Sequence, residues 1–123
     1  MARPPKCRCI CSLPKYTGFT PEGISPDETI RIGLDEFEVL RLIDYVGFSQ
    51  EKCAGRMGVS RPTVARLYEH ARHSVAEAMV LGKRLVIEGG DVCVCLAMKP
   101  ECANEPFCCH RQNNTNIGED VEP

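Results

Sequence analysis

Residues 50–69 have the sequence QEKCAGRMGVSRPTVARLYE, and this stretch decides the fold that we predict. Ser49 can cap a short helix, and Gly58 can end that helix because glycine tolerates a positive φ. Ser60 can cap a longer helix, in which Pro62 is allowed because the first turn has no internal partner for the missing N–H. The apolar positions of the short helix are Cys53, Ala54 and Met57.

Two helices that cross near a right angle make specific demands on the sequence. They need a small residue where they approach most closely, a residue free to be left-handed in the turn, and apolar residues on both sides. Ala54 and Gly58 meet the first two demands. The apolar residues are Cys53, Met57, Val59, Val64 and Leu67. The stretch therefore predicts a helix-turn-helix unit, and the alternative is an amphipathic helical hairpin with no DNA role.

A first helix is predicted on the N-terminal side of this unit. Its apolar face begins at Leu34, and Asp35 followed three residues later by Glu38 is typical of a helix start. Gly47 ends it. The acidic residues Asp35, Glu36 and Glu38 are interpreted as cap and dipole partners rather than as a catalytic pair.

Two short strands are predicted to flank the helices, at residues 29–32 and 84–88, where they could pair in one subunit or between two. The fold class is therefore mainly α: a three-helix helix-turn-helix domain with a short two-stranded β element and a Cys-rich C-terminal extension. We divide the chain into a basic, Pro-rich arm at 1–28, the helix-turn-helix domain at 29–90, a Cys-rich metal-binding segment at 91–112 and a disordered acidic tail at 113–123.

Composition narrows the class of protein. The chain has 123 residues, of which 43% are hydrophobic and 26% charged, as in an ordinary globular domain. This length excludes a large multi-domain enzyme. No apolar run approaches the ~18 residues of a membrane helix, and no secretory signal opens the chain, so we expect a cytoplasmic protein without membrane contact.

Charge is unevenly distributed along the chain. The net charge is −2, but residues 1–20 contain four basic and no acidic groups, and residues 61–84 contain five basic and two acidic groups. A protein that binds nucleic acid by bulk charge would be basic overall. Any contact with DNA must therefore be local.

The third helix supplies the candidate DNA-binding residues. Arginine can make a bidentate contact with guanine or hold a phosphate, threonine can donate to phosphate or touch a thymine methyl group, and a helix N-terminus attracts phosphate. The residues left outside the core stripe at this end are Ser60, Arg61, Pro62, Thr63, Ala65, Arg66 and His70. We interpret His70 and His73 as exposed or facing the DNA backbone, because no thiol or carboxylate is placed to complete a metal site with them.

Several motifs match a known family in order along the chain. They are LDEFEVLRL at 34–42, GFSQE at 47–51, RMGVSRPT at 56–63 and IEGG at 87–90. The sequence resembles the domain of unknown function 134 (UPF 0251) group over about residues 3–90. This resemblance implies a helix-turn-helix like that of sigma factor region four, a DNA-binding regulatory role and a contact with RNA polymerase. Pro62, Val64 and Gly55 depart from the family's usual residues.

Nine cysteines are unusual in so short a chain. Cys53 is assigned to the core, because its helix position requires a small apolar side chain. A C-terminal group comprises Cys93, Cys95, Cys102, Cys108, Cys109 and His110, and an arm group comprises Cys7, Cys9 and Cys11.

Clustered thiols of this kind indicate a soft-metal site, with zinc or an iron–sulfur cluster as the candidates. The spacing matches neither a usual zinc finger nor a ferredoxin, so the metal is not identified. Redox-active thiols, or no site at all, are the alternatives. Whether the two cysteine groups form one site or two is also open.

These observations favour a sequence-specific DNA-binding protein that acts as a transcriptional regulator, modulated by metal or redox state at the cysteines. It is expected to be a homodimer on double-stranded DNA, because one small helix-turn-helix covers only a half-site. The alternative is a metal-binding or electron-transfer protein that uses the helical domain as a scaffold. An enzyme is not expected, since His110 is the only histidine close in sequence to a cysteine nucleophile.

Overall fold

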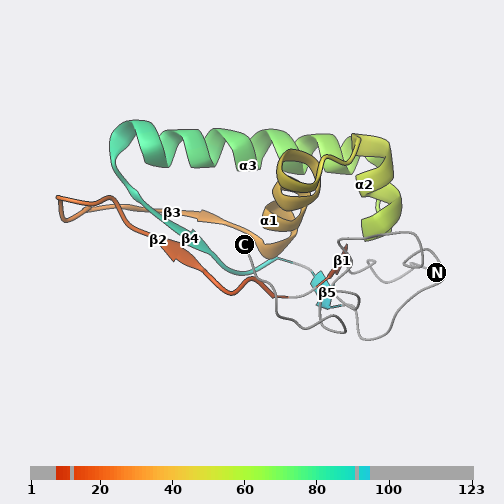
Figure 1. Cartoon of the computed structure of the whole chain (residues 1–123), viewed down its shortest axis with the longest axis horizontal. Coiled ribbons are helices and arrows are strands. Elements are labelled where there is room, and N and C mark those ends of the chain that lie inside the picture. Colours follow the sequence, from red (N-terminus) through yellow and green to blue (C-terminus); the bar gives the residue numbers. More distant parts are fainter. Residues whose placement is uncertain (1–7, 12, 91, 95–123) are drawn as a thin grey trace, which may run out of the picture.

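The computed structural model describes residues 8–11, 13–90 and 92–94. A long helix α3 (Arg61–Leu81) lies along one side of the molecule, and α1 (Leu34–Leu40) and α2 (Gln50–Met57) pack against its N-terminal half (Figure 1). Strands β2 (Gly18–Phe19), β3 (Thr29–Ile32) and β4 (Arg84–Ile87) lie beneath its C-terminal half. The expectation of a mainly α protein is corrected to a mixed helix and sheet fold.

The predicted ends of α2 and α3 are confirmed. The Ser49 hydroxyl accepts a hydrogen bond from the Lys52 N–H at 3.0 Å, and the Ser60 hydroxyl accepts one from the Thr63 N–H at 3.3 Å. Gly58, at φ 71°, forms the left-handed turn between the helices. Each cap therefore satisfies a backbone group that the first turn of a helix leaves without a partner.

The first helix begins at Leu34 and ends at Gly47 as predicted, but its N-terminal cap and its last turns differ from the prediction. The N-cap residue is Gly33, and Glu36 in the first turn accepts its N–H at 2.8 Å. The start motif predicted from Asp35 and Glu38 is therefore shifted to Gly33 and Glu36. After Leu40 the helix widens into the π-helical segment η1 (Arg41–Val46). The Gly47 N–H donates to the Leu42 carbonyl at 3.0 Å, five residues earlier, and this wider turn ends the helix.

The β structure is also larger than the predicted two-stranded element. Strand β4 pairs in parallel with β3 within one chain, which is one of the two arrangements left open by the sequence, and antiparallel with β2, which comes from the predicted irregular arm. A second, two-stranded sheet joins β1 (Arg8–Ile10) in parallel to β5 (Val92–Val94). Pattern alone could not reveal β1 or β2, because each is three residues or shorter and neither shows a full alternation period.

Two hydrophobic clusters hold these elements together. The larger one lies between the three helices and includes Val39, Met57 and Val64, and Ile10 of β1 packs into it at 2% exposure. The smaller one lies between the sheet and the C-terminal half of α3 and includes Ile32, Ala78 and Ile87. Strand β1 is thus part of the core, although the arm that contains it was expected to be an extended segment.

Candidate nucleic-acid interface and cysteine cluster

The first turns of α3 present the predicted DNA-binding residues at the surface. Arg61, Pro62 and Arg66 are exposed, and Thr63 and Ala65 are half-buried. The predicted core stripe of the same helix is confirmed by the burial of Val64, Leu67 and Ala71, but Met79, which was expected to continue the stripe, is exposed. The two arginines therefore stand on a helix end that its caps and core contacts fix in place.

An open hollow of about 600 Å³ lies beside this helix end. It is lined by Gly55 of α2, Gly58 of the turn, Ser60 and Thr63 at the start of α3, and Arg8 of β1. Sequence reasoning did not predict that Arg8 lies there, because only the pairing of β1 with β5 and its packing on the core bring the arm to this surface. The hollow lies at the N-terminus of α3, and a helix N-terminus attracts phosphate.

His70 occupies a different position from the rest of the predicted set. Its Nδ1 contacts the Glu36 carboxylate of α1. On either side of it in the same helix, the Tyr68 hydroxyl donates to Asp44 of η1 at 2.7 Å, and Arg72 lies 3.4 Å from the same carboxylate. That hydrogen bond is the main reason that the pKa of Tyr68 is raised. These contacts brace α3 against the first helix.

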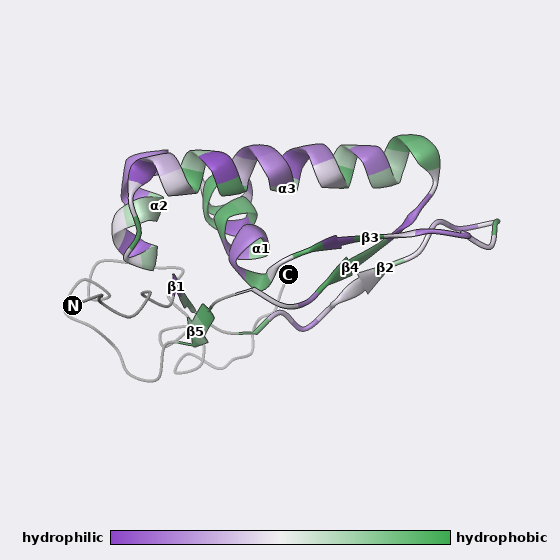
Figure 2. Cartoon of the chain, turned by 180° about the vertical axis from the view of Figure 1, so that it is seen from behind, coloured by the Kyte–Doolittle hydropathy of each residue, from purple (hydrophilic) through white to green (hydrophobic). Residues whose placement is uncertain are grey.

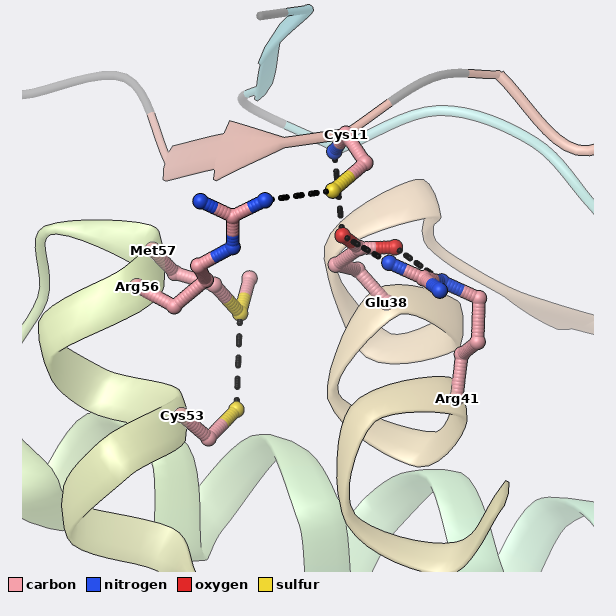
Figure 3. Close-up of polar contacts among 6 residues, drawn as sticks. All are labelled: Cys11, Glu38, Arg41, Cys53, Arg56 and Met57. Carbon is pink, nitrogen blue, oxygen red and sulfur yellow. Dashed lines mark hydrogen bonds and ion pairs between the residues drawn. The ribbon is translucent and has the colours of Figure 1, made fainter. Parts of the chain in front are cut away.

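A buried charge network lies where β1 meets α1 and α2 (Figure 3). Glu38 is only 1% exposed, and its carboxylate accepts two hydrogen bonds from Arg41 at 3.0 Å and one from the Cys11 N–H at 3.0 Å. Burial acts to lower the pKa of Arg41, but the hydrogen bond and the charge of Glu38 outweigh it and raise that pKa. Glu38 is therefore a buried structural anion, which the sequence interpretation as a helix cap did not anticipate.

The sulfur of Cys11 belongs to the same network. Arg56 of α2 donates a hydrogen bond to it at 3.1 Å, as Figure 3 shows. Cys11 is 6% exposed, so the expectation that the arm cysteines lie outside the core is wrong for this residue. A second arm residue is held by charge as well, since Arg8 donates to the buried Asp35 at 2.7 Å. Strand β1 and Cys11, the residue after it, are thus tied by polar contacts to both of the helices beside them.

The assignment of Cys53 to the core is confirmed. The side chain is fully buried, and its sulfur lies 3.7 Å from that of Met57. Burial, and then the nearby charge of Glu38, raise the pKa of the Cys53 thiol to about 12. A thiol that keeps its proton at neutral pH is a poor nucleophile and a poor metal ligand, so Cys53 has a packing role.

The other cysteines are only partly described. Cys9 and Cys93 lie opposite each other in the paired strands β1 and β5, and both are half-buried. The predicted ligands outside the described residues are Cys7, Cys95, Cys102, Cys108, Cys109 and His110. Within residues 8–11, 13–90 and 92–94, no group of three or more histidine, cysteine or acidic side chains is arranged to hold a metal.

The C-terminal half of α3 has a different surface from its N-terminal half. Met79 and Val80 are 74% and 80% exposed, and the end of the helix is hydrophobic in Figure 2. Below it, an apolar groove of about 530 Å³ runs between α3, α1 and the three-stranded sheet, with Phe19 and Phe37 in its lining. Among the described helices, none is long and apolar enough to cross a membrane.

The chain is thus a small protein of mixed helix and sheet. Its capped helix pair carries two exposed arginines, and the pairing of β1 with β5 places Cys9 opposite Cys93. Residues 1–95 match the model of a family described as "Protein of unknown function DUF134", and the chain belongs to this family. The predicted family resemblance is therefore confirmed.

Curated relatives of the chain are UPF0251 proteins. One from Chlorobium chlorochromatii is 40% identical over 84% of this chain and 65% of its own length, and one from Desulforudis audaxviator is 47% identical over 74% and 61%. A third, from Desulfitobacterium hafniense, is 41% identical over 83% of both chains. The chain thus spans slightly less than two thirds of the first two relatives. No solved structure matches it significantly.

Proposed function

We propose that this chain is a sequence-specific DNA-binding protein that acts as a transcriptional regulator, with α2 and α3 as a helix-turn-helix unit. In this proposal the first turns of α3 enter the major groove, which is wide enough for one helix. The observation that supports it best is the exposure of Arg61 and Arg66 on a helix end whose caps and buried stripe fix its orientation.

The surroundings of that helix end support the same proposal. The hollow beside it is lined by Arg8, Ser60 and Thr63, and side chains of these types commonly contact phosphate in protein–DNA complexes. Arg61 and Arg66 would read or grip the groove, while the N-terminus of α3 would hold a backbone phosphate and fix the register. His70 would then act within the protein, because it contacts Glu36.

A homodimer completes the proposal, since a single small unit covers a half-site and two units cover a palindromic operator. The apolar end of α3, at Met79 and Val80, lies at the far end of the helix from the two arginines and offers a surface for the second copy. Sedimentation velocity of the full chain and of Met79→Glu tests this arrangement. We expect a dimer that Met79→Glu weakens, and a monomeric parent chain contradicts it.

The test of DNA binding starts with selection of preferred duplexes from a random pool by the full chain. Binding of the selected duplex is then measured by fluorescence anisotropy at several salt concentrations. We expect Arg61→Ala and Arg66→Ala together to lower affinity by about 30- to 20,000-fold, as expected for two groove contacts of 1–3 kcal/mol each. An arginine that contacts only phosphate would reduce the salt slope by about one when replaced.

Arg31→Ala is the matched control. Arg31 is exposed and pairs with Glu88. It belongs to β3, which lies beneath the C-terminal half of α3 and away from its first turns (Figure 1). Its loss removes the same charge but should leave affinity within about twofold, because distant surface charges are screened within about 10 Å at ordinary salt. If no duplex is preferred, or if the three substitutions have equal effects, the helix pair is an amphipathic hairpin without a DNA role.

A further inference from the structure

The pairing of β1 with β5 places two cysteines opposite each other. Cys9 of β1 is the register partner of Cys93 of β5, although the two residues lie far apart in the sequence. The two strands lie side by side when the molecule is seen from the front and from behind (Figure 1 and Figure 2). Register partners in paired strands point to the same face of the sheet. The two thiols are therefore neighbours on one face of this small sheet.

That face is turned away from the hydrophobic core. Ile10, the residue after Cys9, is buried in the larger core cluster, and Val92, the residue before Cys93, packs against the same cluster. Because side chains alternate along a strand, Cys9 and Cys93 point to the other side. Both are half-buried, so a small reagent in the solvent can reach them.

The other two cysteines in the described part of the chain are much less accessible. Cys53 is fully buried among the helices. Cys11 is 6% exposed, and its sulfur accepts a hydrogen bond from Arg56 at 3.1 Å. Oxidation of thiols is selective for those that a reagent can approach. Among the described residues, Cys9 and Cys93 are therefore the pair that an oxidant meets first.

The backbone arrangement of this pair suits a disulfide. A disulfide can join two cysteines whose Cα atoms are about 4.4–6.8 Å apart and whose Cβ atoms do not point away from each other. Neighbouring strands lie about 4.8 Å apart, and register partners share a face, so this pair meets both conditions. We propose that Cys9 and Cys93 form a reversible disulfide, and that this bond holds β1 in place on the helix pair.

The bond forms by thiol–disulfide exchange with a small disulfide, for which oxidised glutathione is the probe. The thiolate of one cysteine attacks this disulfide, which gives a mixed disulfide and releases one molecule of reduced glutathione. The second cysteine then attacks the protein sulfur of the mixed disulfide, which forms the bond between Cys9 and Cys93 and releases the second glutathione. Two electrons and two protons thus pass from the two protein thiols to the reagent, and an excess of a small thiol reverses both steps.

The bond matters because β1 is a short strand held by few residues. A sheet of two strands with three residues in each is marginal by itself in water. Polar contacts tie this segment to the first helix, since Arg8 donates to Asp35 and the Cys11 N–H donates to Glu38. A disulfide closes the long loop between β1 and β5, so it disfavours states in which β1 has left these partners. Any effect of this on DNA binding rests on the proposed function, whereas the disulfide itself does not.

The first test uses the full chain, reduced in the presence of a metal chelator and then treated with limiting oxidised glutathione. The remaining thiols are alkylated, the chain is digested, and the linked cysteines are located by tandem mass spectrometry. We expect the first intramolecular disulfide to join Cys9 to Cys93. Cys53→Ala is the matched control and should give the same bond, because it removes a thiol that is fully buried. A first disulfide that joins either residue to any other cysteine overturns the proposal, and so does the absence of an intramolecular disulfide.

A second test measures whether the bond holds β1 in place. Cys11 follows β1 directly, so its buried thiol reacts with iodoacetamide only when this segment opens. We expect oxidation to slow the alkylation of Cys11 by about tenfold or more, and the same treatment of Cys93→Ser to leave the rate unchanged. An equal rate in the reduced and oxidised parent chain, or the same slowing in Cys93→Ser, overturns this role of the bond. No DNA is present, so none of these results bears on the DNA-binding proposal.

Discussion

The polar contacts that fix the helix pair and those that fix strand β1 join residues at very different separations along the sequence. At the start of α2 and of α3, a serine accepts the N–H of the residue three positions later. The contacts that hold β1 join residues 27 positions apart at Glu38 and Asp35, and 45 positions apart at Arg56. The helix pair can therefore form its polar contacts locally, whereas those of β1 exist only in the complete fold.

The helix caps and the contacts of β1 also differ in burial, and burial decides how much free energy of unfolding each contact contributes. The caps are exposed, so water can replace a lost bond, and a missing cap typically costs about 1 kcal/mol. The network at β1 surrounds a carboxylate that is 1% exposed. Removing one member of such a network leaves a buried charge without a partner, which costs about 3–5 kcal/mol. The following predictions test this contrast, from the largest expected effect to the smallest.

Glu38→Ala should lower the free energy of unfolding by about 3–5 kcal/mol, because it leaves Arg41 and the Cys11 N–H without their acceptor. Urea unfolding followed by circular dichroism measures this loss. Glu38→Gln keeps an acceptor for the N–H and should lose less. If Glu38→Ala is no less stable than Ser60→Ala, the long-range network has no greater weight than a local cap.

The Cys53 thiol should make stability fall at alkaline pH. Burial and the charge of Glu38 raise its pKa in the folded protein from 9.0 to about 12. Between these values the unfolded chain binds fewer protons than the folded one, so stability is complete below pH 9 and is lost as the pH rises towards 12. The slope is up to about 1.4 kcal/mol per pH unit.

Unfolding measured from neutral pH to about pH 11 tests this slope. Cys53→Ala should flatten it, whatever its effect at neutral pH. Tyr68→Phe serves as the comparison, because the hydroxyl of Tyr68 also titrates at high pH but is held by Asp44 at the surface. Equal slopes for the parent and Cys53→Ala would show that the buried thiol does not control alkaline stability.

Gly55→Ala should stabilise the helix pair by about 0.5–1 kcal/mol, since alanine is the better helix former. A Cβ built at Gly55 meets nothing within 4 Å, so the substitution adds no clash. Gly58→Ala is the contrasting control and should destabilise, because Gly58 has φ 71°. Thermal unfolding separates the two. A destabilised Gly55→Ala would mean that α2 needs this glycine for a reason other than space.

Local rules predicted the helix pair well. Capping, turn formation and helical periodicity all act within a few residues, so Ser49, Gly58 and Ser60 could be assigned their roles directly. The same rules gave the strands at Ile30 and Val86 and the buried place of Cys53. They failed at the first helix, where Glu38 at helix-start spacing was interpreted as a cap. Its burial depends on β1 arriving from 27 positions away.

The sequence by itself thus determined the three helices, the glycine turn between α2 and α3, and the exposure of Arg61 and Arg66, because helix formation and amphipathic burial follow from neighbouring residues. Only the tertiary structure decided that β1 enters the core, that Arg8 lies beside the start of α3, and that Cys9 meets Cys93. Contacts across such distances in the chain have no local pattern, since they form only when the core has closed the intervening loop.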